Sequence, residues 1–172
     1  IGQMLSRADP VGAAMLDGFR PSASEVAFFL LSGGTTGLPK LIPRTHDDYA
    51  CFIAAAAEMA ELNRDSVYLV AMPISHNFPL GAPGAFGTLA CGARLVLAMS
   101  PNPETAFALI ERERVSITAQ VPAVTIQWLD SPLRDKYDLS SLRVLQVGGS
   151  RLPAEVAQRV KPLLGATVQQ VY

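Results

Sequence analysis

The sequence has no excess of charge of either sign and no long apolar run. Its 14 Lys and Arg residues are balanced by 15 Asp and Glu residues, which gives a formal net charge of −1. Domains that bind nucleic acids are typically strongly basic, so this balance argues against a nucleic-acid partner. The longest apolar runs, Val26–Leu31 and residues 51–57, are far shorter than the about 20 residues of a membrane-spanning helix. With no basic-then-apolar signal at its start, we expect a cytoplasmic protein without a membrane partner.

Cysteine is also scarce. The two cysteines, Cys51 and Cys91, are far apart in the sequence, lack the close spacing of metal ligands and lie among apolar residues. We therefore expect two buried, reduced thiols, with a disulfide or a reactive thiol as the alternatives.

The composition predicts a folded domain. Of the 172 residues, 49% are hydrophobic and 17% are charged, which excludes intrinsic disorder and suits one ordinary domain. The sequence begins at Ile1 and stops at Tyr172 inside the apolar run 166–172. We interpret it as a fragment of a longer protein.

Short apolar runs alternate with segments of helical spacing. This alternation predicts an α/β fold, a mostly parallel sheet with helices on both faces and right-handed crossovers. The run Val26–Leu31 is expected to be a buried strand. Further strands are expected at 41–42, 67–72, 93–99, 116–121, 143–147 and 166–172, and helices at 80–90, 104–114, 122–130 and 153–161.

A further helix is expected to begin at Thr45. Its hydroxyl can cap the free backbone N–H groups, and Asp48 complements the helix dipole. The apolar face of this helix is expected to contain Tyr49, Phe52, Ile53, Ala56 and Met59.

The strongest chemical signal is the stretch from Ser32 to Lys40, Ser-Gly-Gly-Thr-Thr-Gly-Leu-Pro-Lys, directly after a predicted strand. Its glycines free the backbone to point successive N–H groups into one concavity, and its hydroxyls and Lys40 add donors and positive charge. It is not a Walker loop, because the Gly-Lys-Ser/Thr sequence is missing. The alternative is a plain hairpin turn. The residues that we expect to bind phosphate are Ser32, Gly33, Gly34, Thr35, Thr36, Gly37 and Lys40.

This loop, continued by residues 41–49, resembles the phosphate-loop signature of adenylate-forming enzymes. The variant present here is similar to that of the aryl-acid branch, which contains the 2,3-dihydroxybenzoate–AMP and salicylate–AMP ligases of siderophore biosynthesis. Three further segments, residues 76–80, 145–149 and 169–172, match the family in the family's order. Together the matches cover most of the chain from about Glu25 onward.

The resemblance implies a fold and a reaction. Residues 25–172 would be part of the large N-terminal AMP-binding domain, with residues 1–24 as its lead-in and the C-terminal domain absent. The family's reaction joins an aromatic carboxylic acid to AMP from ATP and Mg²⁺, then passes the aryl group to the phosphopantetheine thiol of an aryl carrier protein. A glutamate that helps hold Mg²⁺ would follow Tyr172, so we expect no metal site in this fragment, and no activity from the fragment alone.

The resemblance also assigns the aryl-acid site. His76 would lie near the substrate carboxylate as a catalytic residue, and Asn77 would bind an ortho-hydroxyl, since a carboxamide both donates and accepts. Phe78 would form an apolar wall for the ring or pack in the core. Ala82 replaces a serine usual in dihydroxybenzoate enzymes and a cysteine frequent in salicylate enzymes, and its methyl group offers no hydrogen bond.

A second group of residues would line the adenine and aryl pockets. Gly148 and Gly149 end a strand, and without side chains they leave room for a ligand or form a tight turn. By resemblance Ser150 and Val171 belong to the same lining, and Tyr172 would stack on adenine.

Two other functions remain open at this point. One is another acyl- or amino-acid-activating enzyme of the same superfamily. Asn77 opposes an amino-acid substrate, because amino-acid activators usually have an aspartate in this region that holds the amine. The other is a nucleotide-binding module without turnover. The choice between 2,3-dihydroxybenzoate and salicylate also stays open.

Overall fold

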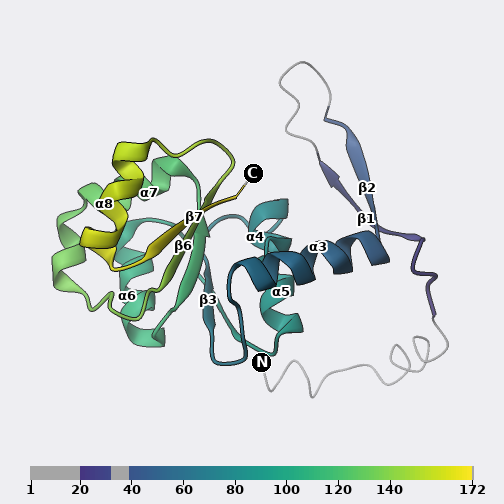
Figure 1. Ribbon diagram of the computed structural model, residues 1–172, viewed down its shortest axis with the longest axis horizontal. Coiled ribbons are helices and arrows are strands. Elements are labelled where there is room, and N and C mark those ends of the chain that lie inside the picture. The colour runs from purple at the N-terminus through teal and green to yellow at the C-terminus, as the bar shows by residue number, and fades with distance from the viewer. Residues whose placement is uncertain (1–19, 32–38, 172) are drawn as a thin grey trace. The chain divides into compact units, whose positions relative to one another are not determined.

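The computed structural model describes residues 20–31 and 39–171 (Figure 1). The chain divides into two compact units, Ile1–Asp48 and Tyr49–Tyr172. The second unit contains the parallel sheet.

The first unit contains a β-hairpin. Strand β1 (Val26–Leu31) pairs antiparallel with β2 (Leu41–Thr45), and Leu31 lies opposite Leu41. Residues 32–40 join the two strands in the sequence, and residues 32–38 lie outside the described residues. The predicted strand is present, but the prediction that it is buried was wrong, since Phe29 is 55% exposed. Among the described residues of this unit, no second layer covers the two-stranded ladder.

Helix α3 (His46–Met59) begins as predicted. The Thr45 hydroxyl accepts a hydrogen bond from the Asp48 N–H at 3.2 Å, and the Asp48 carboxylate accepts one from the Thr45 N–H at 3.2 Å. This reciprocal pair is a capping box. The Arg44 guanidinium donates to both carboxylate oxygens and holds the pKa of Asp48 below its usual value.

The second unit contains a five-stranded sheet in which every neighbouring pair is parallel, in the order β4-β3-β5-β6-β7. This confirms the predicted fold class. The strands are β3 (Val67–Val70), β4 (Arg94–Leu97), β5 (Ile117–Gln120), β6 (Val144–Gly148) and β7 (Thr167–Val171). The helices that connect them are α4 (Asn77–Gly81), α5 (Gly84–Ala90), α6 (Pro103–Glu113), α7 (Pro122–Asp130), the 3₁₀ helix η1 (Pro132–Lys136) and α8 (Ala154–Leu164).

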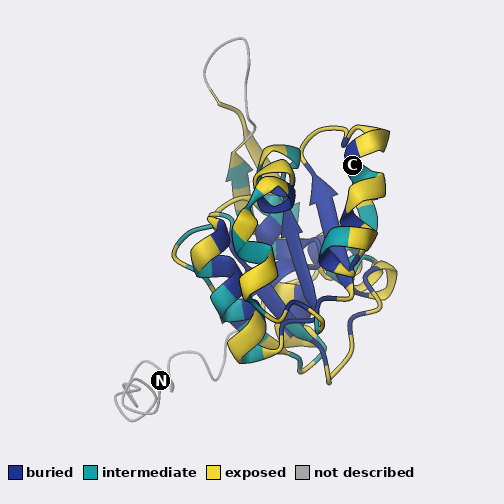
Figure 2. Cartoon of the chain, turned by 90° about the vertical axis from the view of Figure 1, so that its left-hand side faces the viewer, coloured by how far each residue is buried: buried dark blue, intermediate teal, exposed yellow. Residues whose placement is uncertain are grey.

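Helices cover both faces of this sheet, also as predicted. On one face Leu69 belongs to a core with Phe107 of α6 and Trp128 of α7. On the other face Tyr68 packs in a cluster with Ala57 of α3. Figure 2 shows the buried strands between helices whose outer sides are exposed.

The order of the strands reverses at β3. The chain leaves β3 for β4 on one side through α4 and α5, then returns past β3 to β5, β6 and β7 through α6, α7 and α8. Crossovers between parallel strands have the same hand. When the chain reverses its direction across the sheet, the connecting helices must therefore move to the other face. The segments that follow β3 and β6 therefore leave the sheet toward opposite faces. Ligands of such sheets bind in the crevice at the carboxyl ends of the strands.

Three local expectations need correction. The predicted helix 80–90 is divided into α4 and α5 around the cis Ala82–Pro83 bond. Met59 is 67% exposed, because the buried positions of α3 are Tyr49 and Ala57. Cys51 is exposed and Cys91 is half-buried, so the prediction of two buried cysteines was wrong, whereas both thiols are free as expected.

None of the helices in residues 20–31 and 39–171 combines the length and the apolarity that crossing a bilayer requires.

The last residue of β5 is an unpaired polar residue in the core. Gln120 is 1% exposed, and within the described part of the chain neither its amide oxygen nor its amide nitrogen has a hydrogen-bond partner. An unpaired buried amide costs about 1–3 kcal/mol of stability. Gln146 on β6 is buried as deeply, but its amide is bonded to Tyr68 and Gln169.

These two glutamines give a matched prediction for the complete protein. Gln120→Leu should raise the free energy of unfolding by about 1–2 kcal/mol, because it removes two unsatisfied groups without leaving a cavity. Gln146→Leu should lower it, because Tyr68 and Gln169 then lose a partner. Urea unfolding measures both changes. Destabilisation by Gln120→Leu as large as that by Gln146→Leu would contradict the assignment.

Candidate functional site

A cavity of about 480 Å³ opens at the carboxyl ends of the parallel strands. This volume is within the range of small-molecule sites. The cavity brings together seven residues that the sequence analysis selected from separate segments, and two that it did not. It is lined by Phe52, His76, Asn77, Phe78, Ala82, Gly149, Ser150, Arg151 and Val171.

His76 is held at the entrance to α4. Its backbone is extended, and its ring Nδ1 accepts a hydrogen bond from the Phe78 N–H at 3.2 Å. An accepting Nδ1 carries no proton, so the neutral ring has its N–H at Nε2. The ring is exposed and lines the cavity, where this N–H is a suitable donor to an anionic oxygen.

Asn77 is held by a residue that the sequence analysis had placed only on an apolar helix face. The Tyr49 hydroxyl donates a hydrogen bond to Asn77 Oδ1 at 3.0 Å, and Tyr49 is only 3% exposed. A clue was present in the sequence, since a buried tyrosine usually finds a partner for its hydroxyl. The helical pattern does not identify that partner.

Phe78 and Gly148 fit against one another. A Cβ atom at Gly148 would lie 2.9 Å from Phe78 Cζ and 3.0 Å from the carbonyl oxygen of Val171. The space beside Gly148 is thus occupied by the Phe78 ring, which corrects the expectation that it is open to a ligand. Phe78 packs against the core and also lines the cavity, so core packing is observed and its role as a wall for the ring stays a prediction.

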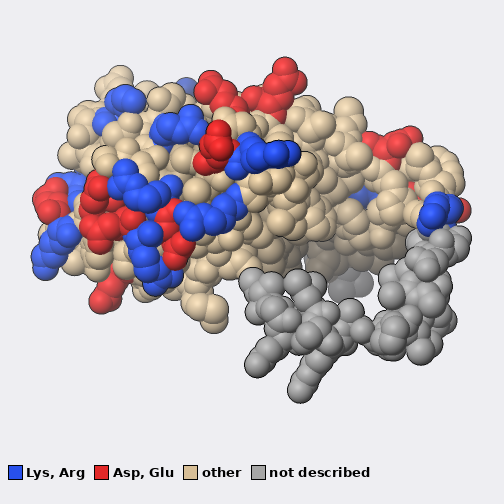
Figure 3. Space-filling view, turned by 90° about the horizontal axis from the view of Figure 1, so that it is seen from below, with Lys and Arg blue, Asp and Glu red and all other residues tan. Residues whose placement is uncertain are grey.

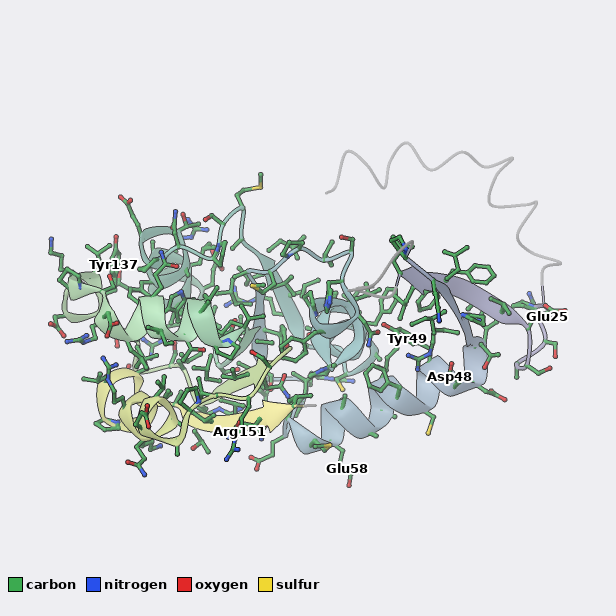
Figure 4. The ribbon with its side chains drawn as sticks, turned by 90° about the horizontal axis from the view of Figure 1, so that it is seen from above. Glu25, Asp48, Tyr49, Glu58, Tyr137 and Arg151 are labelled. Atoms are coloured by element: carbon green, nitrogen blue, oxygen red, sulfur yellow. The ribbon has the colours of Figure 1, made fainter. Side chains whose placement is uncertain are left out.

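The turn after β6 supplies the opposite wall. Gly149 has φ of +82°, a conformation that favours glycine, so the tight-turn interpretation holds at this position. Ser150 and Arg151 follow it at the cavity. Arg151, shown in Figure 4, places a positive charge there. Arg151 was not predicted from the sequence, although it lies two residues beyond the matched segment 145–149.

A chain of hydrogen bonds through two glutamine amides, those of the buried Gln146 and the half-buried Gln169, links four elements. The Tyr68 hydroxyl donates to Gln146 Oε1 at 3.3 Å, Gln146 Nε2 donates to Gln169 Oε1 at 3.4 Å, and Gln169 Nε2 donates to the Met59 carbonyl at 2.9 Å. Burial raises the pKa of the Tyr68 phenol, which stays protonated as the donor. These bonds tie β3, β6 and β7 to the end of α3.

Described acidic and basic side chains are intermixed on the face shown in Figure 3. Ion pairs join Arg94 to Glu113 at 2.9 Å and Arg114 to Asp138 at 2.6 Å. Hydrogen bonds from Ser140 and Arg114 lower the pKa of Asp138 to about 2. In each pair the arginine stabilises the charged form of its carboxylate partner. None of these four residues lines the cavity.

Several predicted site residues lie outside the described residues, namely Ser32, Gly33, Gly34, Thr35, Thr36, Gly37 and Tyr172. Lys40 is described and exposed, in the unit formed by residues 1–48. The assignment of the loop to phosphate therefore stays a prediction. Within residues 20–31 and 39–171, no group of three or more His, Cys, Asp or Glu side chains is placed to hold a metal ion.

The fold and the cavity define an α/β domain with a candidate ligand site at the carboxyl ends of its strands. The profile of the AMP-binding enzyme family matches residues 5–172. The chain therefore belongs to the AMP-binding enzyme family.

Known relatives share about half of its residues. The chain is 53% identical over 150 residues to a 2,3-dihydroxybenzoate-AMP ligase of Bacillus subtilis (strain 168), covering 87% of this chain and 28% of that protein. It is 53% identical over 166 residues to a salicylyl-CoA synthase / salicylate adenylyltransferase of a Streptomyces species, covering 95% and 30%.

The fold is that of solved relatives. The apo structure of MbtA from Mycobacterium smegmatis superposes with a TM-score of 0.77 at 45% identity, covering 86% of this chain and 27% of that one. The chain thus spans less than a third of the length of each of these three relatives.

Proposed function

We propose that the complete protein adenylates an aromatic carboxylic acid with ATP, releasing pyrophosphate, and then transfers the aroyl group to the phosphopantetheine thiol of an aryl carrier protein, releasing AMP. The cavity carries this proposal, because it combines a ring-sized apolar wall at Phe78 with an amide at Asn77 and an imidazole at His76. The names of the two relatives support it, since 2,3-dihydroxybenzoate and salicylate are both 2-hydroxyaryl acids.

The reaction replaces a poor leaving group by a good one. A carboxylate oxygen attacks the α-phosphorus of ATP, the bond from that phosphorus to pyrophosphate breaks, and a mixed anhydride forms. Positioning and electrostatic stabilisation are the main demands of such a step. The substrate ring would lie against Phe78, its 2-hydroxyl beside Asn77 and its carboxylate near the Nε2–H of His76.

The nucleotide would occupy the other wall. Gly149, Ser150 and Val171 would flank it, and Tyr172 would stack on adenine. The loop from Ser32 to Lys40 would bind the β- and γ-phosphates through backbone N–H groups, hydroxyls and the Lys40 ammonium. Mg²⁺ enters this proposal as the ion that accompanies ATP.

Coenzyme A is the alternative to a carrier protein as the acceptor in the second step. The name of the Streptomyces relative includes a coenzyme A synthase as well as an adenylyltransferase. Coenzyme A and a carrier protein both present a phosphopantetheine thiol, so the first step is common to both. Incubation of the complete protein with each acceptor and preformed aryl-AMP distinguishes them.

The class of substrate can be tested directly by ATP–pyrophosphate exchange with the complete protein. Salicylate and 2,3-dihydroxybenzoate should support exchange, whereas amino acids and fatty acids should not. Exchange with an amino or fatty acid and with neither aryl acid would show another activating enzyme. ATP binding without any acyl-AMP would show a nucleotide-binding module without turnover.

Ala82 bears on the choice between the two aryl acids. It is 4% exposed and lines the cavity with a methyl group that forms no hydrogen bond. A 3-hydroxyl pressed against this methyl group would lose water without a replacement partner, at a cost of about 1–3 kcal/mol. On this contact alone salicylate is preferred over 2,3-dihydroxybenzoate by about 5- to 150-fold. A bridging water would remove the preference.

A serine at this position should restore the missing hydrogen bond. Ala82→Ser in the complete protein should raise kcat/KM for 2,3-dihydroxybenzoate relative to salicylate by about 5- to 10-fold. Ala85→Ser is the matched control, since Ala85 is equally buried but does not line the cavity. A wild-type preference for 2,3-dihydroxybenzoate that the serine leaves unmoved would show that position 82 does not contact the ring.

The phosphate assignment is tested by Lys40→Ala and Thr36→Ala in the complete protein. Loss of one charge-assisted contact to phosphate should lower the exchange rate by about 10- to 150-fold, with little change in the free energy of unfolding. Lys161→Ala, on the exposed side of α8, is the control and should change neither. Unchanged exchange in both loop variants would rule out the assignment.

A further inference from the structure

Tyr49 is held in place on several sides. Its ring lies 5.7 Å from that of Phe52 and 6.0 Å, edge to face, from that of Phe86. A Cβ atom at Gly81 would approach the Tyr49 hydroxyl oxygen to 2.3 Å, so only glycine leaves room for the phenol there. The residue is 3% exposed and is not among the residues that line the cavity. Figure 4 shows its position on α3.

The hydrogen bond of Tyr49 selects one orientation of the Asn77 amide. The phenol donates to Asn77 Oδ1 at 3.0 Å. A phenol is a better donor than acceptor, because its oxygen lone pair is delocalised into the ring. Turning the amide over would place Nδ2, which only donates, against this hydroxyl. Oδ1 is therefore kept toward Tyr49, and Nδ2 becomes the end of the amide left for a ligand.

A fixed donor distinguishes two ortho substituents of similar size. In a 2-hydroxybenzoate the hydroxyl proton is drawn to the neighbouring carboxylate, which leaves an oxygen lone pair facing outward as an acceptor. In a 2-aminobenzoate the second N–H of the amine faces outward instead. An outward N–H of the amine would face the N–H of Asn77 Nδ2. Both groups are donors, so neither would have a hydrogen-bond acceptor.

We propose that Tyr49 is a positioning residue that holds the Asn77 amide with Nδ2 toward the cavity, so that the site selects an ortho-hydroxyl over an ortho-amino group. This inference rests on the proposed adenylation of aryl acids and deepens it. Tyr49 acts through Asn77 and does not itself touch the substrate.

The test compares salicylate with 2-aminobenzoate in ATP–pyrophosphate exchange by the complete protein. The quantity measured is the ratio of their kcat/KM values, which is independent of the fraction of each preparation that is folded. The wild-type ratio should favour salicylate at least about tenfold. Tyr49→Phe, which frees the amide to turn, should lower the ratio at least about fivefold, mainly by lowering KM for 2-aminobenzoate.

Two further variants control the result. Tyr68→Phe also removes a buried phenol oxygen, but one that donates to Gln146, and it should leave the ratio unchanged. Gly81→Ala keeps the Tyr49 hydroxyl but displaces it, and it should lower the ratio as Tyr49→Phe does.

A wild-type enzyme active on salicylate whose ratio is unmoved by both Tyr49→Phe and Gly81→Ala overturns this inference alone. A wild-type ratio near one, or an equal fall in Tyr68→Phe, also overturns it. Wild-type protein inactive on every aryl acid contradicts the proposed function itself.

Discussion

The reversal of strand order at β3 is the constraint on which the site depends. Because crossovers keep one hand, the chain must change faces when it changes direction. The connection after β3 therefore runs over one face of the sheet, and the connections after β4, β5 and β6 run over the other. The cavity lies where these connections part, with His76 and Asn77 on one side and Gly149 to Arg151 on the other. Residues 76–78 and 149–151 come from segments after β3 and β6, whereas Phe52 comes from helix α3 and Val171 ends β7.

The cavity residues that follow β3, His76, Asn77 and Phe78, are each positioned by a small number of contacts. His76 is oriented by the backbone of the helix that it precedes, and Asn77 by a phenol from α3. Phe78 is fitted against a glycine of β6. These contacts reach from α4 to α3 and to the sheet, so the polar groups at the cavity are set by packed side chains. Such support is what holds a binding site in a defined geometry.

Much of this could be predicted from the sequence, for identifiable physical reasons. Helix α7 has the predicted bounds, because Pro122 marks its first turn. The cap at Thr45 was predicted because its hydroxyl can accept from a free backbone N–H of the first turn, whereas the bond from the Thr45 N–H to the Asp48 carboxylate was not predicted. Seven of the nine residues that line the cavity were selected from or beside the matched segments, which identify positions within a family but not the contacts between them.

What could not be predicted depends on contacts between distant segments. An apolar run such as Val26–Leu31 indicates a strand, but it does not show how many layers cover that strand. Spacing places Tyr49 on an apolar face without revealing that its hydroxyl meets Asn77, which is 28 residues away. At Gly148 the missing side chain indicated free space, and only the packing shows that a phenyl ring of the same chain fills it.

The central claim is that the cavity binds an aromatic acid with its ring on Phe78 and its 2-hydroxyl on Asn77. A crystal structure of the complete protein with salicylate tests this most directly. We expect the ring in van der Waals contact with Phe78, the 2-hydroxyl oxygen within hydrogen-bond distance of Asn77 Nδ2, and Tyr49 still bonded to Oδ1. Salicylate bound elsewhere, or with its hydroxyl turned away from Asn77, would contradict it.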